Sequence, residues 1–123
     1  MNLKVLLACP ILLLSAMASD AYASIEFPKA LHGVWDLGPE PCRLPVNPDA
    51  DSPMVIKARV LQGYEHTEKP SYVKRASTKM KAWVISTESN IAPGLLVYDL
   101  YVLKGDHLTI TDGEAIRQYR RCI

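Results

Sequence analysis

The chain has 123 residues, a formal net charge of +1 and 22% charged side chains. This length supports one domain, and the composition is that of a globular chain rather than a disordered or collagen-like one. A net charge so close to zero predicts no strong overall attraction to DNA, RNA or anionic lipid. It therefore argues against the class of proteins that bind these polyanions through a large overall positive charge.

The first 23 residues have the layout of an export signal. A lysine at position 4 precedes an apolar stretch at 5–17, and small residues surround Ala18 and Ala23. This layout is typical of a secretory signal peptide, and the apolar stretch is too short to cross about 30 Å of hydrocarbon comfortably. We expect cleavage after Ala23, with Ala18 as the alternative. Residues 24–123 then form one domain in the periplasm or outside the cell, with no membrane span.

Cysteine usage fits that compartment. Cys9 leaves with the signal, so the exported chain keeps Cys42 and Cys122, which allow a single intramolecular pairing. The closed loop of 80 residues is expected to stabilise the fold by roughly 4–5 kcal/mol in the chain-entropy model.

The first half of the domain alternates strand and loop. Residues 27–31 predict one helical turn with Pro28 at its start, and 31–37 a strand. Five prolines between 38 and 53 exclude a helix or a central strand there, which predicts a long loop. Residues 54–61 alternate as one strand, with Lys57 and Arg59 facing outward.

The second half continues as short strands. Strands are expected at 72–78, 81–87, 95–103, 107–111 and 114–122. In 95–103 the even-numbered apolar residues from Leu96 to Val102 are expected to face inward and Asp99 outward. Leu108 and Ile110 are expected inward, and Asp112-Gly113 predicts a two-residue hairpin.

Seven or eight short strands without a helix pattern predict an all-β fold, an antiparallel meander that closes as a barrel and so hides its edges. Gly33-x-Trp35 at the first strand, with Arg120 and Arg121 near the end of the last, is similar to the lipocalin and wider calycin arrangement. That resemblance implies a small lipocalin-like barrel whose Trp35 packs under Arg120 or Arg121 at one end, by cation–π contact.

Two further resemblances concern exported proteins. The layout of signal, Gly33-x-Trp35 and Cys42, with the segment 105–113, resembles small periplasmic inhibitors of secreted metalloproteases, whose disulfide is more local than Cys42–Cys122. Over most of 24–123 the chain looks like small exported bacterial proteins of unknown function. Both resemblances imply fold and compartment, and the second implies no activity.

Candidate sites are few. Glu65 is expected either to be exposed or, if it points inward, to need a cationic partner, which Arg117 or Arg120 would supply; Glu65 and Arg117 are the candidate buried pair. The three histidines are scattered and no nucleophile motif occurs, so we expect no catalytic residues, no metal, no cofactor and no enzyme. The basic cluster at 74–81 is read as a solvated strand face, with contact to an anionic polymer as the alternative.

The expected function is therefore binding. A barrel of a hundred residues leaves little lumen, so an exported protein partner on the rim is favoured over a small apolar ligand inside. The alternatives are an inhibitor of a secreted hydrolase or protease, acting through Ser24–Phe27, and a structural envelope protein. Export argues against a nucleic-acid partner.

Overall fold

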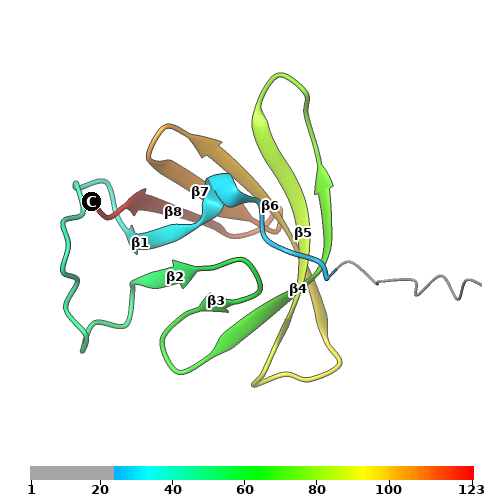
Figure 1. Ribbon diagram of the computed structural model, residues 1–123, viewed down its shortest axis with the longest axis horizontal. Helices are drawn as coiled ribbons and strands as arrows, with labels where there is room; N and C mark the ends of the chain where they lie inside the picture. Colours follow the sequence, from blue (N-terminus) through cyan, green and yellow to red (C-terminus); the bar gives the residue numbers. More distant parts are fainter. Residues whose placement is uncertain (1–23) are drawn as a thin grey trace, which may run out of the picture.

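A computed structural model describes residues 24–123, which wrap into a closed barrel of eight antiparallel strands (Figure 1). The expected signal peptide and its cleavage site lie outside the described residues. The elements are η1 (Lys29–Leu31), β1 (Gly33–Leu37), β2 (Met54–Ile56), β3 (Leu61–Gln62), β4 (Thr67–Arg75), β5 (Lys81–Ser89), β6 (Leu96–Lys104), β7 (His107–Thr111) and β8 (Ile116–Arg121). The all-β meander barrel expected from the sequence is confirmed. Within the described part, no helix has the length and apolarity needed to cross a membrane.

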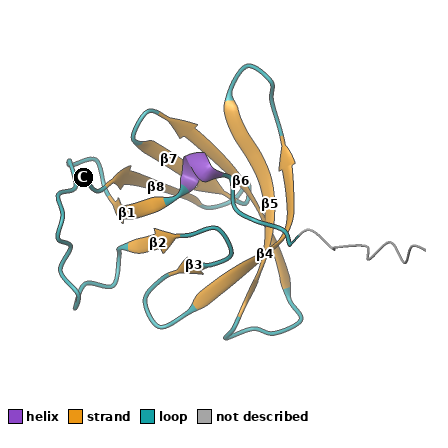
Figure 2. Cartoon of the chain, in the orientation of Figure 1, coloured by secondary structure: helices purple, strands orange, loops and turns teal. Residues whose placement is uncertain are grey.

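Each strand pairs with the next along the chain, and β8 closes the barrel on β1. In such a meander successive connections alternate between the two barrel ends. Helix η1, the single helical turn of the described chain (Figure 2), and the β2–β3, β4–β5 and β6–β7 turns lie at one end, which we call the plug end. The β1–β2 loop and the β3–β4, β5–β6 and β7–β8 turns lie at the other, which we call the mouth end.

The interior is filled by side chains rather than by a channel. Every second residue of a strand faces inward, and the inward set is apolar over most of the barrel height. The core consists of Phe27, Leu31, Trp35, Met54, Ile56, Leu61, Trp83, Ile85, Tyr101, Leu103, Leu108, Ile110 and Tyr119. This packing bears out the expectation that a small barrel has little lumen, and it confirms the inward positions of Leu108 and Ile110.

The stretch 54–61 differs from its prediction as one strand. It forms two short strands, β2 and β3, because the chain reverses at 57–60, where the Lys57 amide donates to the Val60 carbonyl at 2.8 Å. Lys57 and Arg59 therefore lie exposed in a turn rather than on a strand face.

The predicted faces of β6 are inverted. Asp99, Tyr101 and Leu103 are the buried residues of this strand, whereas Leu96 and Tyr98 are 45% and 57% exposed. Both faces of β6 carry apolar residues, so alternation alone could not choose between them. Register decides: Leu103 lies opposite Leu108, an interior residue of β7.

The β7–β8 connection is also longer than predicted. Thr111 pairs with Ile116, so the loop has four residues, 112–115, instead of two. The Asp112 carboxylate accepts hydrogen bonds from the Glu114 and Ala115 amides, both at 2.8 Å. This side-chain turn replaces the tight hairpin that Asp-Gly favours.

The long loop 38–53 is fastened to the outer wall of the barrel. Cys42 and Cys122 form the expected disulfide, with their Cα atoms 4.4 Å apart. Backbone hydrogen bonds from Leu44 to Ile123 and from Ile123 to Cys42 extend the contact. A disulfide of this kind is compatible with an exported protein.

Candidate functional site

The plug end is closed by a tryptophan and an arginine. Trp35 is fully buried, and its indole N–H donates to the Leu31 carbonyl at 3.0 Å. The Arg121 guanidinium lies 4.3 Å from the Trp35 ring centroid and donates to the carbonyls of His32 (2.6 Å) and Ala30 (2.8 Å). Arg121 thereby satisfies carbonyls around η1 while it stacks on the indole.

The two arginines near the C-terminus have different places. Arg121 is inside the barrel end and also contacts Asp106 at 3.2 Å, whereas Arg120 faces outward and donates to the Pro39 carbonyl of the long loop. Of the four residues expected at this end, Gly33, Trp35 and Arg121 come together, and Arg120 does not. All polar groups of this cluster are engaged within the molecule, so the plug end is a structural closure.

Gly33 is required for that closure. Its φ is +145°, and a Cβ there would lie 2.8 Å from the Arg121 Nη1 atom. Gly33→Ala is therefore expected to lower the free energy of unfolding by at least about 1 kcal/mol, since both the backbone and the guanidinium must shift. Urea unfolding of both proteins measures this. An unchanged midpoint would show that Arg121 is free to move aside.

The mouth end holds a shallow polar depression. Its volume is about 110 Å³, below the ~300–1,000 Å³ of typical small-molecule pockets. Hydrophobic side chains line part of it, Met54, Leu61 and Ile110 among them. The polar lining comes from three strands and from the β1–β2 and β3–β4 connections, and consists of Asp51, Ser52, Tyr64, His66, Glu68, Tyr101, Arg117 and Tyr119. The depression fits one side chain of a partner better than a whole ligand.

A buried carboxylate lies at this end. Asp99 is 7% exposed and pairs with Arg117 at 3.6 Å, while Arg117 is half exposed. Burial raises the pKa of the Asp99 carboxyl; Arg117 opposes this rise and Asp112 adds to it. Burial also raises the pKa of the Tyr101 phenol, with Glu68 and Asp99 adding to the effect. Titratable groups perturbed by burial and by one another are characteristic of functional sites.

The Asp99 carboxyl gives a testable pH dependence. Because its folded-state pKa is raised, the native state holds the proton more tightly, and stability contributed by Asp99 falls as pH rises from the usual Asp range through the raised value. Asp99→Asn is expected to remove this fall and to be at least as stable as the wild type at neutral pH. Urea unfolding from about pH 3 to about pH 8 tests this. A less stable variant at neutral pH would mean that the Arg117 pair outweighs the cost of burial.

The predicted buried pair of Glu65 and Arg117 is not present. Glu65 is exposed in the β3–β4 turn, with a φ of +56°, and the carboxylate that Arg117 contacts is that of Asp99. A buried acid does have a cationic partner in this barrel, but the acid is Asp99 rather than Glu65. Sequence reasoning missed Asp99 because it was placed on the outer face of β6.

An apolar lip borders the mouth. The β5–β6 loop and the start of β6 expose Ile91 (71%), Leu95 (60%), Leu96 (45%), Val97 (39%) and Tyr98 (57%). These five residues, the apolar lip, belong to the β5–β6 loop and the first residues of β6, a connection that lies at the bottom of Figure 1. Val97 pairs with Thr87, whose hydroxyl donates to Glu68 of the mouth at 3.5 Å, so the lip and the mouth adjoin. Exposed apolar residues gathered on one loop and the start of the strand that follows it mark interaction surfaces.

A larger groove of about 370 Å³ lies on the outer wall beside β4 and β5. Several of its polar groups already have partners: Asn90 accepts from the Thr67 amide, Glu88 accepts from the Gly94 amide, and Ser71 bonds to Ser86. With its hydrogen-bonding capacity largely satisfied internally, this groove is a weaker candidate than the mouth despite its size.

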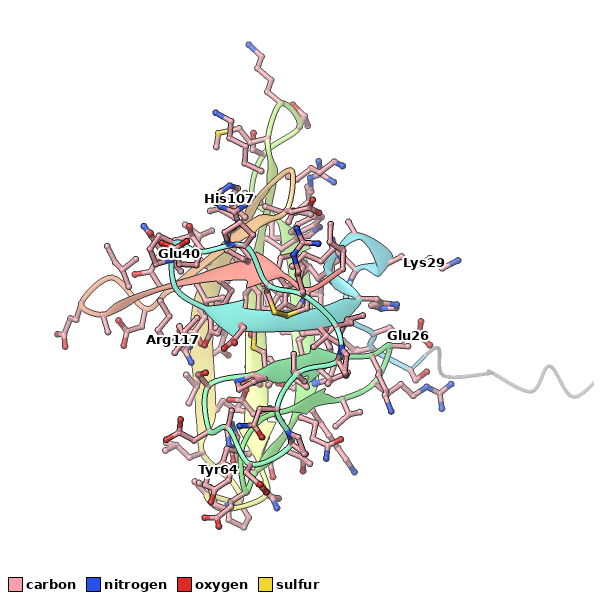
Figure 3. All side chains as sticks on the ribbon, turned by 90° about the vertical axis from the view of Figure 1, so that its left-hand side faces the viewer. Glu26, Lys29, Glu40, Tyr64, His107 and Arg117 are labelled. Atoms are coloured by element: carbon pink, nitrogen blue, oxygen red, sulfur yellow. A yellow bond between two sulfur atoms is a disulfide. The ribbon has the colours of Figure 1, made fainter. Side chains whose placement is uncertain are left out.

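The histidines are separate from one another. His66 lines the mouth and bonds to the Tyr64 carbonyl, His32 bonds to the Phe27 carbonyl at the plug end, and His107 is exposed at the start of β7. Over residues 24–123, no three His, Cys, Asp or Glu side chains are grouped to hold a metal ion. Figure 3 shows Tyr64 at the bottom and Arg117 on the left, away from Lys29 and Glu26 of the plug end.

Comparison with protein families, with curated proteins and with solved structures finds no match to this chain.

Proposed function

We propose that this protein is an exported binding module that recognises a protein partner at the mouth end of its barrel. The observation that carries the proposal is the adjacency of the apolar lip and the small polar mouth. An apolar surface next to a polar recess is the usual anatomy of a protein interface, in which apolar residues exclude water around a few charged contacts. The filled interior supports a partner on the rim over a ligand deep inside.

The charges that line the mouth indicate which kind of side chain a partner would insert there. Among the described residues, Arg117 is paired with Asp99, and no ion pair is formed by Asp51 and Glu68 of the lining or by Asp112 and Glu114 of the neighbouring turn. An acidic recess of this size is complementary to a lysine or arginine side chain. We infer a partner that inserts one basic side chain into the mouth while its apolar surroundings cover the lip.

Short peptides test the recess separately from the partner. In a two-dimensional NMR titration, an acetylated Gly-Lys-Gly amide at up to about 10 mM, enough to detect a few kcal/mol of binding free energy, is expected to shift resonances of Glu68, Arg117 and Tyr119. Glu68→Gln is expected to weaken these shifts. The Gly-Glu-Gly peptide is the control. Equal shifts with both peptides, or shifts spread over the whole barrel, would contradict the proposal.

Protease inhibition through Ser24–Phe27 has less support. Phe27 is 1% exposed, and its amide donates to the Ala58 carbonyl at 2.7 Å. Ser24, Ile25 and Glu26 are the exposed residues of that segment, which is short for an extended strand in a protease cleft. An inhibition assay with and without residues 24–26 tests this alternative, and inhibition that depends on them would restore it.

A further inference from the structure

The net charge is near zero because a basic plug end and an acidic mouth end offset each other. The plug end carries eight exposed cationic side chains from η1, the β2–β3, β4–β5 and β6–β7 turns and the strand ends beside them, which are Lys29, Lys57, Arg59, Lys74, Arg75, Lys79, Lys81 and Lys104. The carboxylates of the mouth lie at the opposite end. Net charge is therefore a poor guide to what each end attracts, because local potential acts over a Debye length of about 10 Å.

Few acids offset this basic end. Among residues 24–123 its carboxylates are Glu26 and Asp106, and both are in ion pairs, with Arg59 at 3.5 Å and with Arg121 at 3.2 Å. Within the described residues, the lysines of this end therefore face solvent and form no ion pair with a carboxylate. They form a positive surface rather than a network of internal salt bridges.

The β4–β5 hairpin presents an apolar residue in the middle of this surface. Met80 is 57% exposed at the hairpin tip, between Lys79 and Lys81. This hairpin projects beyond the other turns at the top of Figure 1.

The tip has a fixed shape. Arg75 lies 5.0 Å from the Trp83 ring centroid and donates to the Ser77 and Met80 carbonyls at 2.8 and 3.1 Å. The Ser77 hydroxyl accepts from the Lys79 and Met80 amides, both at 3.1 Å. A tip held by five such contacts presents Met80 without a large ordering cost on binding.

We propose that the plug end docks on the surface of an anionic phospholipid bilayer, with Met80 entering the headgroup region and the lysines contacting lipid phosphates. An apolar group flanked by ammonium groups is complementary to this interface, where each lysine adds electrostatic attraction and the apolar side chain leaves water. This inference is independent of the mouth, which it leaves facing away from the membrane.

Vesicle co-sedimentation tests the proposal with the protein recovered after export. Vesicles of equimolar phosphatidylglycerol and phosphatidylcholine are expected to bind it, and pure phosphatidylcholine vesicles are not. Lys79→Gln with Lys81→Gln is expected to lower the partition coefficient roughly 25-fold, about fivefold for each lysine. Met80→Trp is expected to show a blue-shifted emission component on anionic vesicles, since the indole leaves water.

The matched control is Lys69→Gln, which removes one exposed cation of β4 near the mouth end and is compared with Lys79→Gln. The two single variants change net charge by the same amount, and Lys69→Gln is expected to leave binding within about twofold, against a loss of about fivefold for Lys79→Gln. Equal losses in these two single variants would overturn the proposal, as would equal binding to both kinds of vesicle. Stronger binding to dextran sulfate than to anionic vesicles, or salt-sensitive self-association that accounts for the sedimented protein, would overturn it in favour of a polysaccharide or a second copy.

Discussion

Replacing Cys42 and Cys122 together by serine is expected to lower the free energy of unfolding by about 4–5 kcal/mol. The disulfide closes a loop of 80 residues, and in the chain-entropy model a cross-link of that length removes roughly this much free energy from the unfolded state. A domain of about one hundred residues has perhaps 5–15 kcal/mol in total. The variant is therefore expected to be marginally stable, with a large fall in its urea midpoint.

The wild-type protein supplies the control for this measurement. Under a reductant its unfolding midpoint is expected to fall to that of the double variant, while the variant itself is expected to be insensitive to reductant. A loss below about 1 kcal/mol would mean that the unfolded state is already compact between these positions, so the cross-link constrains it little.

Trp35→Ala is expected to cost about 3–5 kcal/mol, as for other buried aromatic residues in a well-packed core. The indole is fully buried, supports the Arg121 guanidinium and donates to the Leu31 carbonyl, so its removal leaves a cavity and an unsupported cation. Trp83 remains as a fluorescent reporter of unfolding in the variant.

A double-mutant cycle separates stacking from burial. Trp35→Leu, Arg121→Met and the double variant should give a coupling free energy of roughly 0.5–2 kcal/mol between indole and guanidinium. Arg120→Met is the matched control, because Arg120 faces the outer wall and bonds to the Pro39 carbonyl instead. Coupling of Trp35 to Arg120 as large as that to Arg121 would contradict the arrangement at the plug end.

Much of this architecture is encoded in local patterns. Prolines between 38 and 53 exclude regular structure, and Leu108 and Ile110 alternate with polar neighbours that mark the outer face. These signals are readable because each depends on a residue and its immediate neighbours. Closure of one end by Trp35 and Arg120 or Arg121 is implied instead by the resemblance of Gly33-x-Trp35 and the basic pair at 120–121 to the lipocalin arrangement.

The mouth could not be predicted in the same way. The inward position of Asp99 depends on the register of β6 against β7, and β6 is apolar on both faces. Its partner Arg117 is 18 positions away along the chain, and both meet Glu68 and Tyr101 only once the barrel is closed. The separation of charge between the two barrel ends likewise depends on which turns lie at the same end. The net charge of the chain therefore cannot reveal it.

The disulfide acts where the first and last strands of the barrel, β1 and β8, meet. Seven of the eight strand pairs in this barrel are joined by a direct connection, whereas β8 and β1 meet without one. Cys42 follows β1 and Cys122 follows β8, so their bond supplies the missing link. Strand exchange that separates β1 from β8 is therefore opposed by the disulfide as well as by the packing of the barrel. The closed form of the barrel is thereby coupled to the oxidised state of Cys42 and Cys122.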